Sequence, residues 1–335
     1  MVNDKVPAIL EKYDIEVLRS WKGRGTILCE TKTGIKILKE YKGSKERLLA
    51  QKQLLEEIKK RGFYDVEDIL LTKEGEILVQ DEEKNSYYLK EHWEGKECNV
   101  KEYQEICAVT EQMARLHRSM ELPEYVKENH LEPHSLVKEF EKHNRELIKI
   151  RRYLKEKRQK NEFEYFLYQN FDKFLLKSEK ILEEVKDNCK LLGEKEQAEK
   201  GCLCHGDFQH HNTIFSGNRT YIINFEKFSL DSPMKDLCLF FRKMMEKNNW
   251  SMELGQYVLQ SYQKQKRMSE EEKYQLYYRL SYPEKFWKIA NYYFNSPKTW
   301  IPPKNMEKLE KILKQEEQKF VFLEMNFKDG VLRKS

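Results

Sequence analysis

The chain has 335 residues, 39% of them hydrophobic and 36% charged, which suits a globular protein of two lobes with a densely charged surface. Lys and Arg outnumber Asp and Glu by 62 to 57, and this net charge of +5 is interspersed along the chain, so it gives no argument for nucleic acid as a partner. Seven Cys residues without a C-x-x-C pair argue against a disulfide scaffold and favour synthesis in a reducing compartment.

The N-terminal sequence and the hydropathy pattern indicate neither export nor membrane insertion. Residues 1–7, MVNDKVP, lack the apolar core of a signal peptide. No apolar run approaches the roughly 18 residues that are needed to span a bilayer. We therefore expect synthesis in the cytoplasm and no membrane partner.

The first 92 residues are expected to form a small mixed lobe. Short helical and strand patterns predict helices over 1–13 and 44–61 and strands over 16–21, 26–31, 34–41, 66–72, 75–80 and 86–92. Gly23 and Gly25 lie in the first turn between strands, where glycine would let backbone N–H groups approach a phosphate. An ordinary hairpin turn explains these two glycines equally well.

Lys39 lies near the end of the third expected strand, where it would either neutralise nucleotide phosphates or lie in solvent. A protein kinase places a Glu on the following helix to pair with this lysine. The corresponding turn here holds Gln51 and Lys52, and Glu56 or Glu57 could replace that Glu only if the helix were shifted. The sequence therefore leaves the partner of Lys39 open.

Residues 91–95 form the expected linker between the small lobe, 1–92, and a larger helical lobe, 93–335. In a nucleotide-binding protein the backbone of this linker would meet the adenine edge, so Glu91 and Trp93 are candidate cofactor-binding residues. Beyond the linker, apolar residues recur mostly at helical spacing. His117, near the end of the first of these helices, is more typical of a structural residue than of a catalytic one.

The stretch 202–226 contains the candidate catalytic and metal-binding residues. Asp207 and Asn212 are five positions apart and can project from one polar loop, and Asn224 and Glu226 follow at the end of the next hairpin. In-line phosphoryl transfer needs a carboxylate that orients the attacking hydroxyl and oxygen ligands for magnesium. If 224–226 continue a strand, Glu226 points to the same side as Asn224 and recovers part of the charge that an Asn lacks.

Two other interpretations of this stretch are a polar turn between buried strands and a zinc site. The zinc ligands would come from the Cys and His residues at 202, 204, 205, 210 and 211. Their spacing does not match usual zinc sites, and a strand would bury both thiols as small apolar groups.

The octapeptide 205–212, His-Gly-Asp-Phe-Gln-His-His-Asn, resembles the H-G-D-x-x-x-x-N motif of the aminoglycoside phosphotransferase-like branch of the protein-kinase-like superfamily. The D-x-D or D-x-E that follows in that branch reads Asn-Phe-Glu at 224–226, a departure at its first position. Within the branch, the chain is most similar to the CotS-type spore coat family of spore-forming Firmicutes. The stretches that carry this likeness are 38–41, 93–97, 116–117, 282–288, 291–293 and 300–302.

The resemblance implies an α+β, bilobal protein-kinase-like fold with ATP between the lobes. Lys39 would hold the phosphates, Asp207 and His205 would be catalytic, and Asp236 would brace the loop. Asn212, Asn224 and Glu226 would hold Mg²⁺. Other spore coat proteins and a small-molecule or sugar acceptor are the implied partners. The family location would be the spore coat.

Two functions follow from this likeness. One is an ATP-dependent phosphotransferase that acts on a hydroxyl of a small molecule or sugar. The other is a kinase-fold scaffold of the coat with impaired catalysis, because Asn224 brings no negative charge to a metal.

Overall fold

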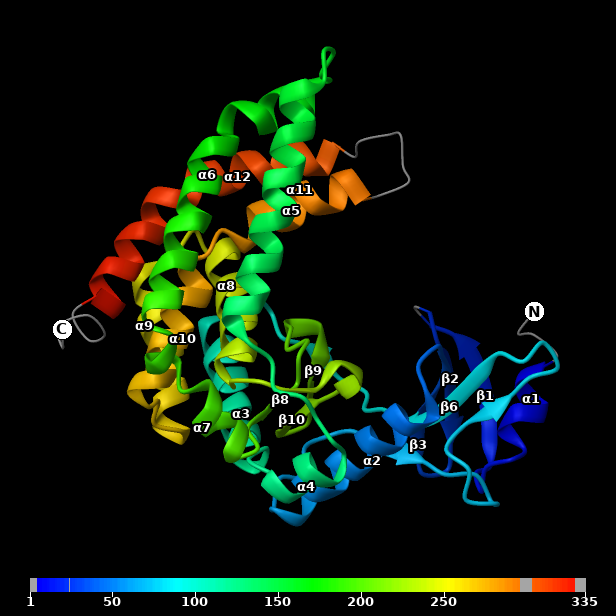
Figure 1. The fold of residues 1–335 in the computed structure, drawn as a ribbon. Helices are drawn as coiled ribbons and strands as arrows, with labels where there is room; N and C mark the ends of the chain where they lie inside the picture. Colours follow the sequence, from blue (N-terminus) through cyan, green and yellow to red (C-terminus); the bar gives the residue numbers. More distant parts are fainter. Residues whose placement is uncertain (1–4, 24, 296–302, 329–335) are drawn as a thin grey trace.

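The computed structural model describes residues 5–23, 25–295 and 303–328. A small β-sheet with the N-terminal helix α1 (Lys5–Leu10) lies at one end of the molecule, and helices make up most of the remainder (Figure 1). The start of the chain at 1–4, the turn residue 24 and the 300–302 stretch of the spore coat likeness fall outside the described residues.

The sheet has six strands in the order β1-β2-β3-β6-β4, with β5 pairing to β6, and every pair is antiparallel. The strands are β1 (Val17–Lys22), β2 (Ile27–Thr31), β3 (Gly34–Tyr41), β4 (Ile69–Leu70), β5 (Val79–Gln80) and β6 (Ser86–Glu91). The strands expected over 66–72 and 75–80 are much shorter than predicted. Val66 forms a parallel bridge to Ile222 outside this sheet, so only the next residues can join β6.

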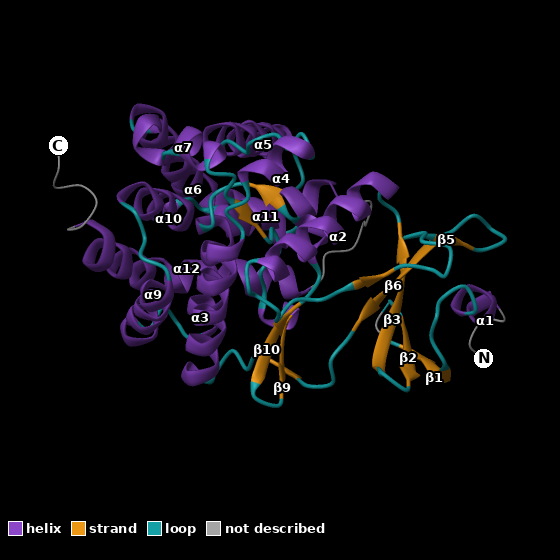
Figure 2. Cartoon of the chain, turned by 90° about the horizontal axis from the view of Figure 1, so that it is seen from below, coloured by secondary structure: helices purple, strands orange, loops and turns teal. Residues whose placement is uncertain are grey.

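The two faces of the sheet have different environments. Leu38 of β3 and Leu89 of β6 are buried against α1. Because side chains alternate along a strand, Lys39 and its cross-strand partner Tyr88 lie on the opposite face. The helix α2 (Lys45–Lys60) lies between the sheet and the helical part (Figure 2), and its buried leucines share one core with α3.

Ten more α-helices are described in the larger part. They are α3 (Tyr103–Ser119), α4 (Pro123–Glu128), α5 (Leu136–Glu156), α6 (Glu162–Asp187), α7 (Glu194–Glu199), α8 (Met234–Lys247), α9 (Met252–Gln265), α10 (Glu270–Ser281), α11 (Glu284–Asn295) and α12 (Pro303–Leu323). The long helices α5 and α6 pack against each other and against α11 and α12 (Figure 1). Ser269 and Glu272 form the expected capping box of α10. No helix in the described ranges is both long enough and apolar enough to cross a membrane.

The site lies on two small strand groups at the junction with the sheet. β8 (Leu203–Cys204) pairs with β11 (Ser229–Leu230), and β9 (Thr213–Ser216) pairs with β10 (Arg219–Ile222) and β7 (Lys96–Glu97). The backbone of Ile222 accepts a hydrogen bond from Glu67 and donates one to Asp65. This backbone pairing fixes the end of the β9–β10 hairpin against the segment that follows α2.

Candidate functional site

The loop after β8 is held in shape by Asp236 in the first turn of α8. Its carboxylate accepts hydrogen bonds from the backbone N–H groups of His205 (2.6 Å) and Gly206 (2.9 Å) and from His117 Nε2 (3.2 Å). Gly206 has φ +80°, and a Cβ there would lie 2.0 Å from the carbonyl oxygen of Lys227. Burial opposes ionisation of Asp236, but the contact with His117 and the backbone donors hold its pKa below the usual value. The buried His117 is therefore placed as a structural residue.

His205 is completely buried within this loop. Its Nδ1 accepts from the backbone N–H of Asp207 (3.1 Å), so Nε2 carries the proton that is donated to the carbonyl oxygen of Ile223 (3.0 Å). Both ring nitrogens are therefore used by the backbone. In place of the expected catalytic role, we propose that His205 is a positioning residue.

Asp207 lies at the tip of the loop, and its side chain is 23% exposed. One carboxylate oxygen pairs with Lys227 Nζ (2.8 Å), and the other accepts from Gln209 Nε2 (2.6 Å). Burial alone would raise the pKa of Asp207, but the hydrogen bonds from Lys227 and Gln209 outweigh it and lower the pKa. A carboxylate with a low pKa is a weak base, so Asp207 is better suited to orient a hydroxyl than to remove its proton.

A chain of hydrogen bonds joins this loop to the sheet. Asn212 Nδ2 donates to the backbone carbonyl of Asp207 (2.7 Å), and Asn224 Nδ2 donates to Asn212 Oδ1 (2.8 Å). Asn224 Oδ1 in turn accepts from Lys90 Nζ (2.7 Å), which comes from β6. Asn224 has φ +70°, a left-handed conformation that Asn tolerates better than most residues.

Glu226 lies beside this chain and pairs with Lys39 of β3. It also accepts a hydrogen bond from the hydroxyl of Tyr88 (2.8 Å). Burial opposes the charge, but Lys90 and Lys39 outweigh it and lower the pKa of Glu226 to about 2. The expectation that 224–226 continue a strand is wrong, because Phe225–Lys227 form a 3₁₀ turn after the left-handed Asn224.

Two residues of this site escaped the sequence analysis. Glu67 is fully buried and accepts hydrogen bonds from Lys90 Nζ (2.6 Å), the backbone N–H of Phe225 (3.0 Å) and Gln51 Nε2 (3.2 Å). Gln51 thus points to the site from the α2 turn where a kinase has its Glu. Strand alternation could have identified Lys90. Side chains alternate along β6, so Lys90 lies on the face of Tyr88 and opposite to the apolar Leu89.

The other candidate cofactor residues lie around the sheet. Gly25 has φ +70° in the turn between β1 and β2. The N–H of Gly23 donates to the carbonyl of Thr26 (2.8 Å), as in a hairpin. Because Ile27 pairs with Leu38, this turn lies at the Lys39 end of β3.

The two candidate residues of the linker, Glu91 and Trp93, contact other side chains of the protein. Glu91 pairs with the buried Lys36 (2.6 Å) on the face opposite Lys39, and its N–H donates to the carbonyl of Asp68. Trp93 stacks on Tyr221 of β10, with ring centroids 4.0 Å apart. Nucleotide contacts by either residue stay a prediction.

Over residues 7–326 the sequence matches the family described as "Spore coat putative kinase YutH". The chain belongs to that family. The likeness to CotS-type spore coat proteins is thereby confirmed, and the protein is kinase-like. No curated protein matches the sequence.

Solved phosphotransferases share the fold. An aminoglycoside phosphotransferase from Alicyclobacillus acidocaldarius is 17% identical, with TM-score 0.84 over 97% of this chain and 96% of its own. Spectinomycin phosphotransferase APH(9)-Ia, in complex with ADP and spectinomycin, is 13% identical, with TM-score 0.64 over 96% and 97%. Amicoumacin kinase hAmiN, in complex with AMP-PNP and Ca²⁺, is 12% identical, with TM-score 0.57 over 93% and 89%. These likenesses show the bilobal α+β fold.

The expected Mg²⁺ ligands of this spore coat kinase family member do not fit the ion as they are arranged. The side-chain oxygens of Asn212 and Asn224 each accept from a protein donor, and Glu226 is held by Lys39 and Tyr88. Magnesium needs octahedral oxygen ligands at about 2.0–2.1 Å, with carboxylate or phosphate among them. Within the described ranges, no cluster of three His, Cys, Asp or Glu side chains is placed to hold a metal, which also removes support for zinc.

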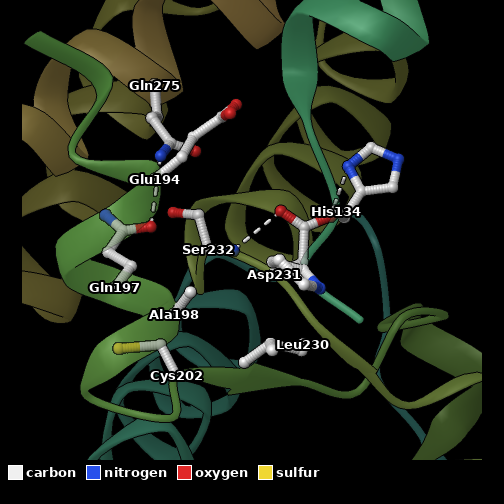
Figure 3. Close-up of a pocket in the computed structure, with 10 residues that line it drawn as sticks. His134, Glu194, Gln197, Ala198, Cys202, Leu230, Asp231, Ser232 and Gln275 are labelled. Atoms are coloured by element: carbon white, nitrogen blue, oxygen red, sulfur yellow. Dashed lines mark hydrogen bonds and ion pairs between the residues drawn. The ribbon is translucent and has the colours of Figure 1, made fainter. Parts of the chain in front are cut away.

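A small polar pocket lies at the opposite end of the β8–β11 pair from Asp207. Cys202, which precedes β8, and Asp231, which follows β11, line it together with Gln197 and Gln275 (Figure 3). Asp231 accepts from the backbone N–H of Ser232 (2.7 Å). The pocket holds space for little more than a water molecule, which leaves no room for a nucleotide or a sugar.

Proposed function

We propose that this protein is a kinase-fold component of the spore coat that binds a nucleoside triphosphate where the sheet meets the β8–β10 loops. One observation carries the proposal: hydrogen bonds run from Lys90 of the sheet through Asn224 and Asn212 to the backbone of Asp207, and Lys39 of the same sheet pairs with Glu226, two residues after Asn224.

Lys39 is the residue that would meet the phosphates. Its side chain is 30% exposed and its ammonium group already contacts a carboxylate, Glu226. A phosphate oxygen can replace that carboxylate as an acceptor, because both are anionic oxygens that accept charge-assisted hydrogen bonds. Gly25 lies at the same end of the sheet, where a glycine would let the backbone approach the phosphates.

Thermal unfolding with and without ATP tests nucleotide binding. A ligand that binds only the folded state at 100 times its dissociation constant stabilises it by about 2.7 kcal/mol, so ATP is expected to raise the melting temperature. The variant Lys39→Met is expected to lose most of that rise. Lys42→Met is the matched control, because Lys42 lies just past the same strand with an 86% exposed side chain. An equal loss in both variants, or no rise in the parent protein, contradicts the proposal.

Phosphate transfer to a hydroxyl of a small molecule or sugar is the second candidate function. A cavity of about 250 Å³ beside Gly206 favours it, with Glu139, His143, Lys235 and Trp287 among its lining residues. This cavity mixes charged, aromatic and polar groups, which suits a compact polar acceptor. ATP turnover that rises with sugars or amino alcohols and disappears in Asp207→Asn would support transfer. A turnover that Asp207→Asn leaves unchanged would exclude it.

A further inference from the structure

Lys90 lies between the sheet and the loop that carries Asn224. It belongs to β6, and its cross-strand neighbour on β3 is Ile37. Its side chain is 2% exposed, and its ammonium group lies 2.6 Å from Glu67 Oε2 and 2.7 Å from Asn224 Oδ1. A buried ammonium therefore bonds directly to the oxygen at which the family pattern has its metal-binding carboxylate.

This contact determines which atom donates in each hydrogen bond between Lys90 and the backbone of Asp207. A lysine ammonium can only donate, so the oxygen of Asn224 faces it and the Asn224 amide nitrogen faces Asn212. The oxygen of Asn212 must accept that bond, which leaves its nitrogen to donate to the carbonyl of Asp207. An aspartate at 224 could accept from Lys90, but it could not donate to Asn212. Asparagine is thus the residue that satisfies both neighbours.

Charge and distance both act against a divalent metal at this place. Two ammonium groups, Lys39 and Lys90, face two carboxylates, Glu67 and Glu226, so these four side chains are neutral together. A magnesium ion on Asn224 Oδ1 would lie about 2 Å from that oxygen and hence within about 5 Å of the Lys90 ammonium. Neither amide oxygen brings a charge that offsets the repulsion.

We infer that Lys90 takes the place of the divalent cation at Asn224, so that the polyphosphate of a nucleotide is held by the Lys39 ammonium group without a metal. Lys39 meets the phosphates, and Lys90 supplies a fixed positive charge behind Asn224. This inference rests on the proposed nucleotide binding. It also predicts that Asn224→Asp alone does not create a metal requirement, because Lys90 would pair with the new carboxylate.

The test compares ATP binding in excess EDTA with ATP binding in excess Mg²⁺, by calorimetry. The parent protein and Asn224→Asp are expected to bind equally well in both. The combined variant Glu67→Gln, Lys90→Met, Asn224→Asp is expected to bind at least tenfold more weakly in EDTA than in Mg²⁺. Changing Glu67 and Lys90 together leaves neither member of that pair as a buried unpaired charge, and circular dichroism checks that the variant is folded.

Lys36→Met is the matched control. Lys36 is an equally buried lysine of the same sheet, paired with Glu91 at 2.6 Å on the opposite face. Its replacement by Met should leave the ratio of the two affinities unchanged. A tenfold loss of affinity in EDTA by the parent protein, or a metal requirement in Asn224→Asp, overturns the inference.

A direct metal titration separates this inference from the proposed function. Mn²⁺ binding, followed by electron paramagnetic resonance, is expected in the combined variant and not in the parent protein. If no form binds ATP, nucleotide binding is excluded as the function, and the Mn²⁺ titration still decides the role of Lys90. Mn²⁺ bound by the parent protein, or by no variant, contradicts that role.

Discussion

Glu226→Gln offers a quantitative test of the charge arrangement at the site. The folded protein holds the pKa of Glu226 at about 2, against an ordinary value of 4.5. Each unit of difference corresponds to about 1.4 kcal/mol, so ionised Glu226 contributes about 3 kcal/mol to the free energy of unfolding at neutral pH. Because the pKa is lowered on folding, this contribution is complete above the unfolded value and is lost as pH falls towards 2. At pH 4 roughly 1 kcal/mol of it is already lost.

Urea unfolding at pH 7 and pH 4 measures this contribution. At pH 7 the free energy of unfolding of the parent protein is expected to exceed that of Glu226→Gln by about 3 kcal/mol. At pH 4 this difference is expected to be smaller by about 1 kcal/mol. Glu40→Gln is the control, since Glu40 lies next to Lys39 on β3 in an exposed pair with Lys42, and such pairs contribute between about 0 and 1 kcal/mol. A gap for Glu226→Gln that does not change with pH would refute the assignment of its low pKa to Lys90 and Lys39.

Four further substitutions, one of them a control, test the loop, its support by α8 and the capping of α10. Asp236→Ala leaves two backbone donors and a buried histidine without their acceptor and should lower the free energy of unfolding by about 3–5 kcal/mol in urea; an unchanged midpoint contradicts the bracing role. Gly206→Ala places Cβ 2.0 Å from a backbone oxygen at φ +80° and should cost about 3 kcal/mol or more. Gly217→Ala, at φ +58° with no atom within 4 Å, should cost only about 1 kcal/mol by the same measurement, and equal costs would refute the clash. Ser269→Ala removes the N-cap of α10 and should lower the melting temperature by the equivalent of about 1 kcal/mol; no change would contradict the cap.

The sequence predicts an element correctly where the local pattern alone defines its ends. β3 begins and ends at the predicted residues, Gly34–Tyr41, because alternation and bounding turns define it. The strand expected over 66–72 was wrong in length, since Val66 pairs with Ile222, far away in the sequence. Strand alternation does not reveal which partner a residue will meet, so errors gather at the junction between the sheet and the helices.

At the site, the motif located the loop but not the partners of its charges. His205 was expected to be catalytic, and the structure shows both of its ring nitrogens bonded to backbone atoms. Glu226 was expected to share a side with Asn224, but the left-handed Asn224 turns the chain first. Lys90 and Glu67 went unnoticed because a charged residue within a strand normally lies in solvent. Only the tertiary structure brings them together.

The sequence departs from the kinase pattern at two positions around Lys39, and both departures remove a negative charge. Gln51 stands where the helix would carry a Glu, and Asn224 stands where the hairpin would carry an Asp, so two carboxylates are missing around Lys39. A divalent ion would then lack the negative charge that holds it. Lys90 supplies a cation that is covalently part of the chain, and Glu67 neutralises it. The four charged side chains form two ion pairs, Lys39 with Glu226 and Lys90 with Glu67. These two pairs are the arrangement that the proposed metal-free nucleotide site requires.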